Sequence, residues 1–507
     1  MGTARGDLLR RFALAPVRGV ALVAGGLGLA LAAGSVAAAG PWQGGQRVEQ
    51  RGSAHRTGAA RAAAAASAQV RPVPPPSWQP AQDVLLPAAS AVGSTAPLPT
   101  GGGLAASLST ALSASVLGKV SASVLDGATG QSLYASDADN PLTPASTNKL
   151  LTAVTALSLL GPGHRFGTRV LSPAPGRLVL VGGGDPTLTG APTGGDDPQA
   201  SLATLADRTA AALTATHTAT VTLTYDISLF AGGARSPRGV DDNLAPIQSL
   251  TVDEGRIDPH TVENAPRYGD PAATAAATFV RLLRQRGITV LGAPTAGTGP
   301  AGAPGTAPAT ASNAAAPSAP LAEVSSQPLS EIVERMLTDS DNDIAETLGH
   351  QIALATGRTP TFANGAAAVL QQLSRLGVPL GATRLTDASG LDGGDAVPAA
   401  VLTRVLMLAA SPAHPELRSV ISGLPVLGFA GTLDNPSYTP PSASAGLGVV
   451  RAKTGTLKTV NTLAGLVVDR DGRLLVFAFM SNGTAGADAV RGPLGSLAAR
   501  VAGCGCR

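Results

Sequence analysis

Lysine is scarce in this sequence of 507 residues, which contains four lysines and thirty-two arginines. Arginine cannot lose its proton in a protein, whereas a buried lysine can do so and then act as a base. In a chain so biased toward arginine, we expect the remaining lysines to include positions where arginine would fail. Two of the four, Lys149 and Lys453, lie in short motifs that fit one chemistry.

Cysteine is nearly absent as well, because the only two residues, Cys504 and Cys506, stand at the extreme C-terminus. A Cys-Gly-Cys pair offers too few ligands for a structural zinc site, so it predicts a strained disulfide or no role. The rest of the chain has no thiol that could serve as a nucleophile. The six histidines are scattered without the spacing of a metal site.

Aromatic residues make up only 3% of the chain, and its formal charge of +3 is small for this length. No dense run of basic residues occurs, which argues against a nucleic-acid partner. Alanine, glycine and proline are abundant instead. The length allows two or three domains with ample core.

An export signal is predicted at the N-terminus. Arginines up to Arg18 precede residues 19–40, an uncharged stretch rich in Ala, Leu, Val and Gly. A basic flank, an apolar run and small residues are typical of a secretory signal peptide, but the run also approaches the ~20 residues that span a bilayer. Cleavage of residues 1–40 and their retention as a membrane-contacting anchor both remain open. Residues 41–105, rich in Ala, Pro, Gly and Ser, are predicted to be a disordered linker.

Periodic patterns after the linker predict alternating helices and strands. Helices are expected at 146–160, 202–215, 272–286, 329–337, 344–356 and 485–501, and strands at 120–125, 131–134, 177–181, 218–225, 288–291, 449–456, 463–468 and 474–480. Asp471-Gly472 marks a tight turn between the last two strands. Residues 293–320 have low complexity and are expected to form an exposed loop.

The first motif is Ser146-Thr147-Asn148-Lys149, at the start of an expected helix. A serine hydroxyl is a poor nucleophile until another group takes its proton. Residues three apart at a helix start share one face, so a neutral Lys149 could deprotonate Ser146. Taken alone, the motif more often marks a helix N-cap followed by a surface lysine.

Two further motifs follow, Ser340-Asp341-Asn342 and Lys453-Thr454-Gly455-Thr456. Alone, the first fits an ordinary helix cap and the second an edge strand protected by a lysine. Glycine on a strand often marks the close approach of a ligand. All three motifs in this order, at a helix start, an inter-helix loop and a strand, indicate one active site.

Other catalytic patterns are missing. The glycine-rich stretch Gly182–Pro186 lacks the Gly-Lys-Ser/Thr of a phosphate-binding loop and predicts a turn. No Ser/His/Asp triad and no Gly-x-Ser-x-Gly elbow is apparent.

With these motifs the chain resembles the penicillin-binding serine D,D-peptidases, and most closely the low-molecular-mass D-alanyl-D-alanine carboxypeptidase/endopeptidase family, peptidase family S13. Further stretches carry the resemblance: Val181–Leu188, Asp341–Leu348, Asp387–Leu391 and Ala452–Thr456. The family usually reads Gly-Ser-Gly-Leu-Ser after the aspartate near position 387, where this chain has Ala-Ser-Gly-Leu-Asp, so the role of that loop stays open.

The resemblance implies an α/β fold of the penicillin-binding and β-lactamase-like transpeptidase type, an antiparallel sheet flanked by helices. It implies a discontinuous catalytic domain, residues 106–167 and 321–503, with a large insertion at residues 168–320. No metal or organic cofactor is implied.

The resemblance also implies a role for each motif residue. Ser146 would be the acylated nucleophile and Lys149 its general base. Ser340 would relay a proton to the leaving group, and Asn342 would bind the peptide amide. Lys453 would hold Ser340 and the substrate carboxylate, and Thr454 would bind that carboxylate. Gly455 and Thr456 would also belong to the substrate-binding strand. The backbone N–H groups of Ser146 and Thr456 would form the oxyanion hole.

The expected activity is a D-Ala-D-Ala carboxypeptidase, and possible D,D-endopeptidase, that acts on peptidoglycan stem peptides outside the cytoplasm and is acylated by β-lactam antibiotics. Three alternatives remain open. A serine β-lactamase would differ in fast deacylation, and a non-catalytic peptidoglycan-binding protein would not release D-alanine. An unrelated esterase on the same fold is the third.

Overall fold

The computed structural model describes residues 96–192, 194, 199–230, 236, 242–261, 264–298, 319–484 and 486–506. The predicted export segment and most of the predicted linker lie outside these residues. Within the part of the chain that is described, no helix is both long enough and apolar enough to cross a membrane.

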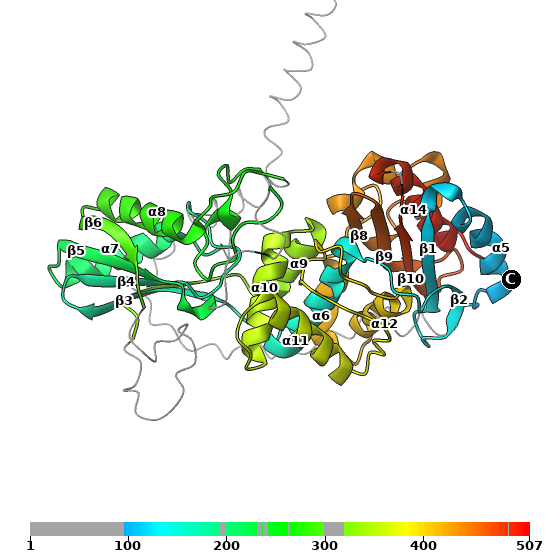
Figure 1. The fold of residues 1–507 in the computed structure, drawn as a ribbon, viewed down its shortest axis with the longest axis horizontal. Coiled ribbons are helices and arrows are strands. Elements are labelled where there is room, and N and C mark those ends of the chain that lie inside the picture. The colour runs from blue at the N-terminus through cyan, green and yellow to red at the C-terminus, as the bar shows by residue number, and fades with distance from the viewer. Residues whose placement is uncertain are drawn as a thin grey trace, which may run out of the picture. The chain divides into compact units, whose positions relative to one another are not determined.

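The first sheet is antiparallel throughout, with strand order β2-β1-β10-β9-β8. Its strands are β1 (Lys119–Asp126), β2 (Ser132–Ser136), β8 (Arg451–Leu457), β9 (Val460–Val468) and β10 (Leu474–Asn482). Gly472, with φ of +88°, makes the predicted turn between β9 and β10. Strands from residues 119–136 and 451–482, far apart in the sequence, thus meet in one sheet, as Figure 1 shows.

Helices cover both faces of this sheet. Successive strand residues point to opposite faces, and on β10 the residues of both faces are apolar and buried. On β10, Val476, Ala478 and Met480 pack with the helices on one face, while Phe477 and Phe479 join the core on the other. The core on the first side is shared by α6 (Lys149–Leu160), α9 (Leu329–Thr338), α10 (Asn342–Ala355), α11 (Phe362–Arg375), α12 (Ala399–Ala410) and α13 (Arg418–Ser422). The second face carries α5 (Gly101–Leu112) and α14 (Ala487–Ala502). This mixed α/β fold, an antiparallel sheet flanked by helices, confirms the predicted fold class.

The part of the sequence between α6 and α9 forms a second sheet, with strand order β6-β5-β4-β3-β7. Its strands are β3 (Gly167–Ala174), β4 (Arg177–Val181), β5 (Thr220–Asp226), β6 (Thr289–Ala296) and β7 (Ala322–Ser325). The pairs β4·β5 and β5·β6 are parallel, and β3 pairs antiparallel with β4 and β7. Two amphipathic helices, α7 (Leu202–Ala215) and α8 (Pro271–Gln285), supply much of its core.

Short 3-10 helices complete the described secondary structure: η2 (Ser115–Leu117), η3 (Ala145–Asn148), η4 (Ser228–Phe230), η5 (Asp253–Gly255), η6 (Pro415–Leu417), η7 (Gly431–Leu433), η8 (Pro436–Tyr438) and η9 (Pro441–Gly446). Several longer helices begin at side-chain caps that the sequence supplies. Ser201 accepts from the Thr204 N–H ahead of α7, and Asp270 accepts from the Ala273 N–H ahead of α8. Such caps satisfy donors that a helix start leaves unpaired.

Some boundaries differ from those expected. Helix α5 begins at Gly101, inside the predicted linker. The Thr100 side chain caps it, and its residues Leu104 and Leu108 are buried in the core beside the sheet. Strand β7 lies past residue 320 yet pairs with β3, so the second sheet closes after the expected end of the insertion. Strand β6 extends into the predicted loop 293–320, of which residues 299–318 lie outside the described part.

Candidate active site

The Ser146 hydroxyl lies 3.0 Å from the Nζ atom of Lys149. Ser146 stands on η3, which runs directly into α6 at Lys149, so the helix start brings the two side chains to one face. The preceding residue, Ala145, has φ of +48°, a left-handed conformation that a non-glycine residue rarely adopts. The backbone at Ala145, directly before the serine, is therefore strained and must be stabilised by its surroundings.

Strands β8 and β9 provide that support. The Thr462 hydroxyl on β9 donates to the Pro144 carbonyl (2.7 Å), to which the Thr147 hydroxyl also donates (2.6 Å). A Cβ atom on Gly455 would lie 2.7 Å from the same carbonyl oxygen and 3.0 Å from the amide nitrogen of Ser146. Because Gly455 has no side chain, β8 can approach the Ser146 turn. The sequence suggested that this glycine makes room for a ligand, whereas in the structure it makes room for the backbone of that turn.

Lys149 is fully buried and has three acceptors. Its Nζ atom donates to the hydroxyl of Ser146, to Oδ1 of Asn342 (2.6 Å) and to the carbonyl oxygen of Ser389 (2.9 Å). Burial lowers the pKa of Lys149 from its usual range to about 8, against the opposing effect of nearby carboxylates, Asp387 first. A lysine in this state readily exchanges a proton near neutral pH.

Ser340 and Asn342 lie on the turn between α9 and α10. Asp341, between them, caps α10 by accepting from the Ile344 N–H (2.9 Å), so the helix-cap reading of this motif also holds. Ser340 adopts φ of +60°. This conformation, together with the cap, projects Ser340 and Asn342 into the same cleft as Ser146.

Lys453 approaches from β8. Its Nζ atom donates to the Ser340 hydroxyl and to the Thr454 carbonyl oxygen, each at 2.8 Å. The side chain is fully buried, and burial, followed by the charge of Lys149, lowers the pKa of Lys453 well below its ordinary value. An arriving anion would favour the protonated form of Lys453.

These residues surround an open cleft of about 600 Å³. Every predicted site residue either lines this cleft or contacts a residue that does: Ser146, Ser340, Asn342, Thr454 and Thr456 line it, Lys149 and Lys453 stand behind it, and Gly455 backs the Ser146 turn. The three motifs, far apart in sequence, therefore meet at one place.

The structure adds residues that the motifs did not indicate. Glu346 on α10 accepts hydrogen bonds from the amide N–H groups of Ala388 (3.2 Å) and Ser389 (2.8 Å). Burial, then the charge of Asp387, raises the pKa of Glu346 to about 8. The loop whose sequence departs from the family pattern thus supplies a backbone acceptor for Lys149.

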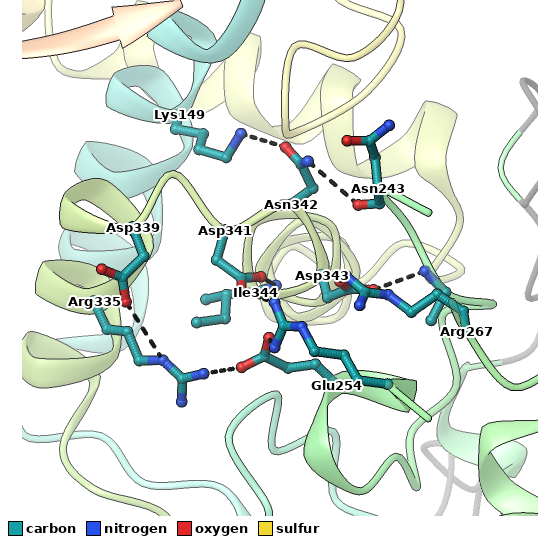
Figure 2. A network of polar contacts seen from close by, with 12 residues as sticks. Lys149, Asn243, Glu254, Arg267, Arg335, Asp339, Asp341, Asn342, Asp343 and Ile344 are labelled. Atoms are coloured by element: carbon teal, nitrogen blue, oxygen red, sulfur yellow. Dashed lines mark hydrogen bonds and ion pairs between the residues drawn. The ribbon is translucent and has the colours of Figure 1, made fainter. Parts of the chain in front are cut away.

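An acidic group lies beside the cleft. Carboxylate oxygens of Glu254, Asp341 and Asp343 fall within 4.8 Å of one another and are buried. Arginine side chains pair with all three, Arg256 with Glu254 and Asp341, and Arg267 with Asp343. Figure 2 shows the three carboxylates and a further pair, Arg335 with Glu254. The guanidinium groups balance the charge that a cation would otherwise compensate, so we assign this group to ion pairing.

Comparison with known proteins gives the family. Residues 104–294 and 262–501 match the D-Ala-D-Ala carboxypeptidase 3 (S13) family. A carboxypeptidase of Mycobacterium tuberculosis is 34% identical over 443 residues, which cover 86% of this chain and 90% of that protein. The D-alanyl-D-alanine carboxypeptidase of an Actinomadura species is 31% identical over 437 residues, covering 72% and 77%.

The fold has a solved counterpart as well. The crystal structure of penicillin-binding protein 4 from Haemophilus influenzae matches with a TM-score of 0.58 and 22% identity, over 75% of this chain and 95% of that one. This match confirms the penicillin-binding fold. The family match and the two relatives confirm the resemblance read from the motifs: the chain is a serine peptidase that belongs to the S13 family of D-Ala-D-Ala carboxypeptidases.

Proposed function

We propose that this serine peptidase removes the terminal D-alanine from peptidoglycan stem peptides that end in D-Ala-D-Ala, through an acyl-enzyme on Ser146. The observation that carries the proposal is the 3.0 Å contact between the Ser146 hydroxyl and a fully buried Lys149 in an open cleft. Neutral Lys149 takes the hydroxyl proton as the oxygen attacks the carbonyl of the penultimate D-alanine.

The oxyanion that forms needs donors already in place. The N–H groups of Ser146 and Thr456 serve this role, because the missing side chain of Gly455 lets the β8 backbone lie against the Ser146 amide. Donors of this kind each contribute about 3 kcal/mol to transition-state stabilisation.

Ser340 and Lys453 handle the leaving group. The peptide C–N bond breaks, and the Ser340 hydroxyl passes a proton to the departing D-alanine nitrogen, replenished through Lys453 at 2.8 Å. The Thr454 hydroxyl and protonated Lys453 bind the terminal carboxylate, and Asn342 binds a substrate amide from the opposite wall. Water then hydrolyses the ester, which frees Ser146 and the shortened peptide acid.

The test is incubation with benzylpenicillin followed by intact-mass measurement. The β-lactam ring opens on the serine without releasing a leaving fragment, so a stable adduct with the mass of the whole drug is expected on Ser146. Ser146→Ala is expected to lose both the adduct and D-alanine release from a D-Ala-D-Ala peptide. Ser442→Ala, which changes an exposed serine whose hydroxyl hydrogen-bonds with that of Ser496, is the matched control and is expected to retain both.

Other outcomes identify the alternatives. Rapid penicillin hydrolysis without an accumulating adduct indicates a β-lactamase, and muropeptide binding without adduct or D-alanine release indicates a binding protein. Release of monomers from cross-linked muropeptides identifies endopeptidase activity, which uses the same acyl-enzyme with a different amine as the leaving group. D-alanine release that persists in Ser146→Ala contradicts the proposal.

The substrate lies outside the cytoplasmic membrane, so the function requires export. The basic and apolar pattern of residues 1–40 supplies a signal for it, either cleaved or retained as an anchor. A reporter enzyme active only outside the cytoplasm, fused to residues 1–105, tests export. Mass analysis of the mature N-terminus decides between cleavage and retention.

A further inference from the structure

The inserted region reaches the Ser340-Asp341-Asn342 turn through a segment that follows β5. The backbone carbonyl of Asn243 accepts from Nδ2 of Asn342 (3.3 Å), and the Ala245 N–H donates to the Asp343 carboxylate (2.8 Å). Asn342 therefore has one end of its amide on Lys149 and the other on the insertion (Figure 2). These contacts join the inserted region directly to a wall of the cleft.

Two buried ion pairs flank Asn342 on either side in sequence. Arg256 pairs with Asp341 at 3.0 Å, and Arg267 pairs with Asp343 at 2.8 Å. All four side chains are at most 7% exposed. Removing one partner of such a pair leaves an uncompensated buried charge, which strongly disfavours the arrangement.

Glu254 extends the network to α9. Its carboxylate pairs with both Arg256 and Arg335, and it stands on η5 with a left-handed φ of +53°. Ser340 also has a left-handed backbone. Its turn is thus stabilised by ion pairs with the inserted region, which are linked through Glu254 to Arg335 on the preceding helix, α9. Strained backbone of this kind persists only where the surroundings over-determine it.

We propose that Arg256 and Arg267 are positioning residues, which act from the inserted region through Asp341 and Asp343 to hold Ser340 and Asn342 against the two catalytic lysines. On this basis the insertion completes the active site. The inference rests on the proposed function, since it concerns the acylation of Ser146. Arg256 and Arg267 also line the cleft, so their guanidinium groups form part of its wall.

The network also affects the base. The charged groups that face Lys149 are Asp387, Asp341, Glu346 and Asp343, whose carboxylates raise its pKa, and Lys453, the other buried cation nearby. Loss of the Arg256 charge leaves Asp341 less compensated beside Lys149. Acylation by Arg256→Gln is therefore expected to require a higher pH, an effect that a merely structural role would not produce.

The experiment compares the rates of acylation by benzylpenicillin, as a function of pH, of wild type, Arg256→Gln and Arg473→Gln. Arg473 pairs with Asp126 at 2.6 Å, is equally buried and lies outside the cleft lining, so it matches Arg256 as a broken ion pair. Arg256→Gln is expected to acylate on the order of 100-fold more slowly, the effect of displacing a catalytic group by about 1 Å, with an upward shift of the pH midpoint. Arg473→Gln is expected to keep the wild-type midpoint and rate.

The outcomes separate the inference from the proposed function. If Arg256→Gln and Arg473→Gln lose acylation rate equally, or if Arg256→Gln acylates at the wild-type rate, the positioning role is overturned. The proposed function still stands in that case, provided that the wild type is acylated. A wild type that forms no adduct overturns both. Should Arg256→Gln fail to fold, Arg256→Lys replaces it, because a lysine ammonium keeps the charge but cannot bridge Glu254 and Asp341 as a planar guanidinium does. An intermediate rate in Arg256→Lys supports the inference, and a wild-type rate overturns it.

Discussion

The carboxylate of Glu346 lies 2.8 Å from the amide nitrogen of Ser389, the residue whose carbonyl oxygen accepts from Lys149. One peptide unit on each side of Ser389 thus links a buried acid on α10 to the candidate base. A second amide, that of Ala388, also donates to Glu346. Glu346 therefore fixes the loop that determines where the Lys149 ammonium group lies.

Replacing Glu346 with alanine is expected to leave two buried amide N–H groups without an acceptor. Each unsatisfied group costs about 1–3 kcal/mol, so the free energy of unfolding should fall by about 2–6 kcal/mol. Glu346→Gln is the matched control, because its side-chain oxygen still accepts and its neutral amide resembles the protonated carboxyl that a pKa of about 8 favours at neutral pH. Urea unfolding and penicillin acylation measure the two effects. Equal losses in both variants would contradict the role of these hydrogen bonds.

Gly455→Ala is expected to abolish most acylation. The added Cβ atom would lie 2.2 Å from the Thr462 hydroxyl and 3.0 Å from the Ser146 amide nitrogen, so β8 must move away from the Ser146 turn. A displacement of about 1 Å at the reacting groups can reduce the rate by about 100-fold. Gly163→Ala is the control, since its Cβ atom would meet nothing within 4 Å. The two acylation rates are measured side by side, and equal rates would contradict the role of Gly455.

The sequence predicted the motif residues because each motif is local. The Ser146–Lys149 contact follows from a helix start, and the exposure of Ser340 and Asn342 follows from the Asp341 cap. The helices at α7 and α9 and the strand β4 were predicted within a residue of their observed bounds. Local periodicity and capping therefore determine these elements and the α9–α10 turn.

The partners of the motifs depended on long-range packing and were not predicted. Arg256 and Asp341 are far apart in sequence, and nothing in either local pattern indicates their ion pair. Ser389 contributes a backbone carbonyl, which residue identity does not encode. Helices α11 and α12 were not predicted. The apolar residues of α12 do have helical spacing, whereas α11 has two weak helix formers, Asn364 and Gly365, in its first turn.

The rate of acylation is expected to rise with pH up to about 8 and then level off. Lys149 must be neutral to take the Ser146 proton, and its pKa is lowered to about 8 by burial. Below that pH the neutral fraction falls about tenfold per unit, so the rate should fall likewise. Stopped reactions with benzylpenicillin between pH 6 and 9.5, followed by intact mass, measure the profile. Lys149→Arg, which keeps the charge but cannot deprotonate, should be inactive throughout. A rate independent of pH across this range would exclude Lys149 as the base.

Reduction of the C-terminal disulfide is expected to have little effect on stability and none on acylation. Cys504 and Cys506 form a disulfide across a single intervening residue. In the chain-entropy account a loop of three residues contributes only about 1.5 kcal/mol, far less than a long loop. Just before α5, the Thr100 N–H donates a hydrogen bond to the Cys506 carbonyl (2.8 Å). This hydrogen bond does not require the sulfur atoms to be joined. Urea unfolding with and without dithiothreitol measures the difference, and intact mass verifies reduction. A loss well above 3 kcal/mol would mean that the disulfide, and not the packing of Leu104 and Leu108, anchors α5 to the sheet.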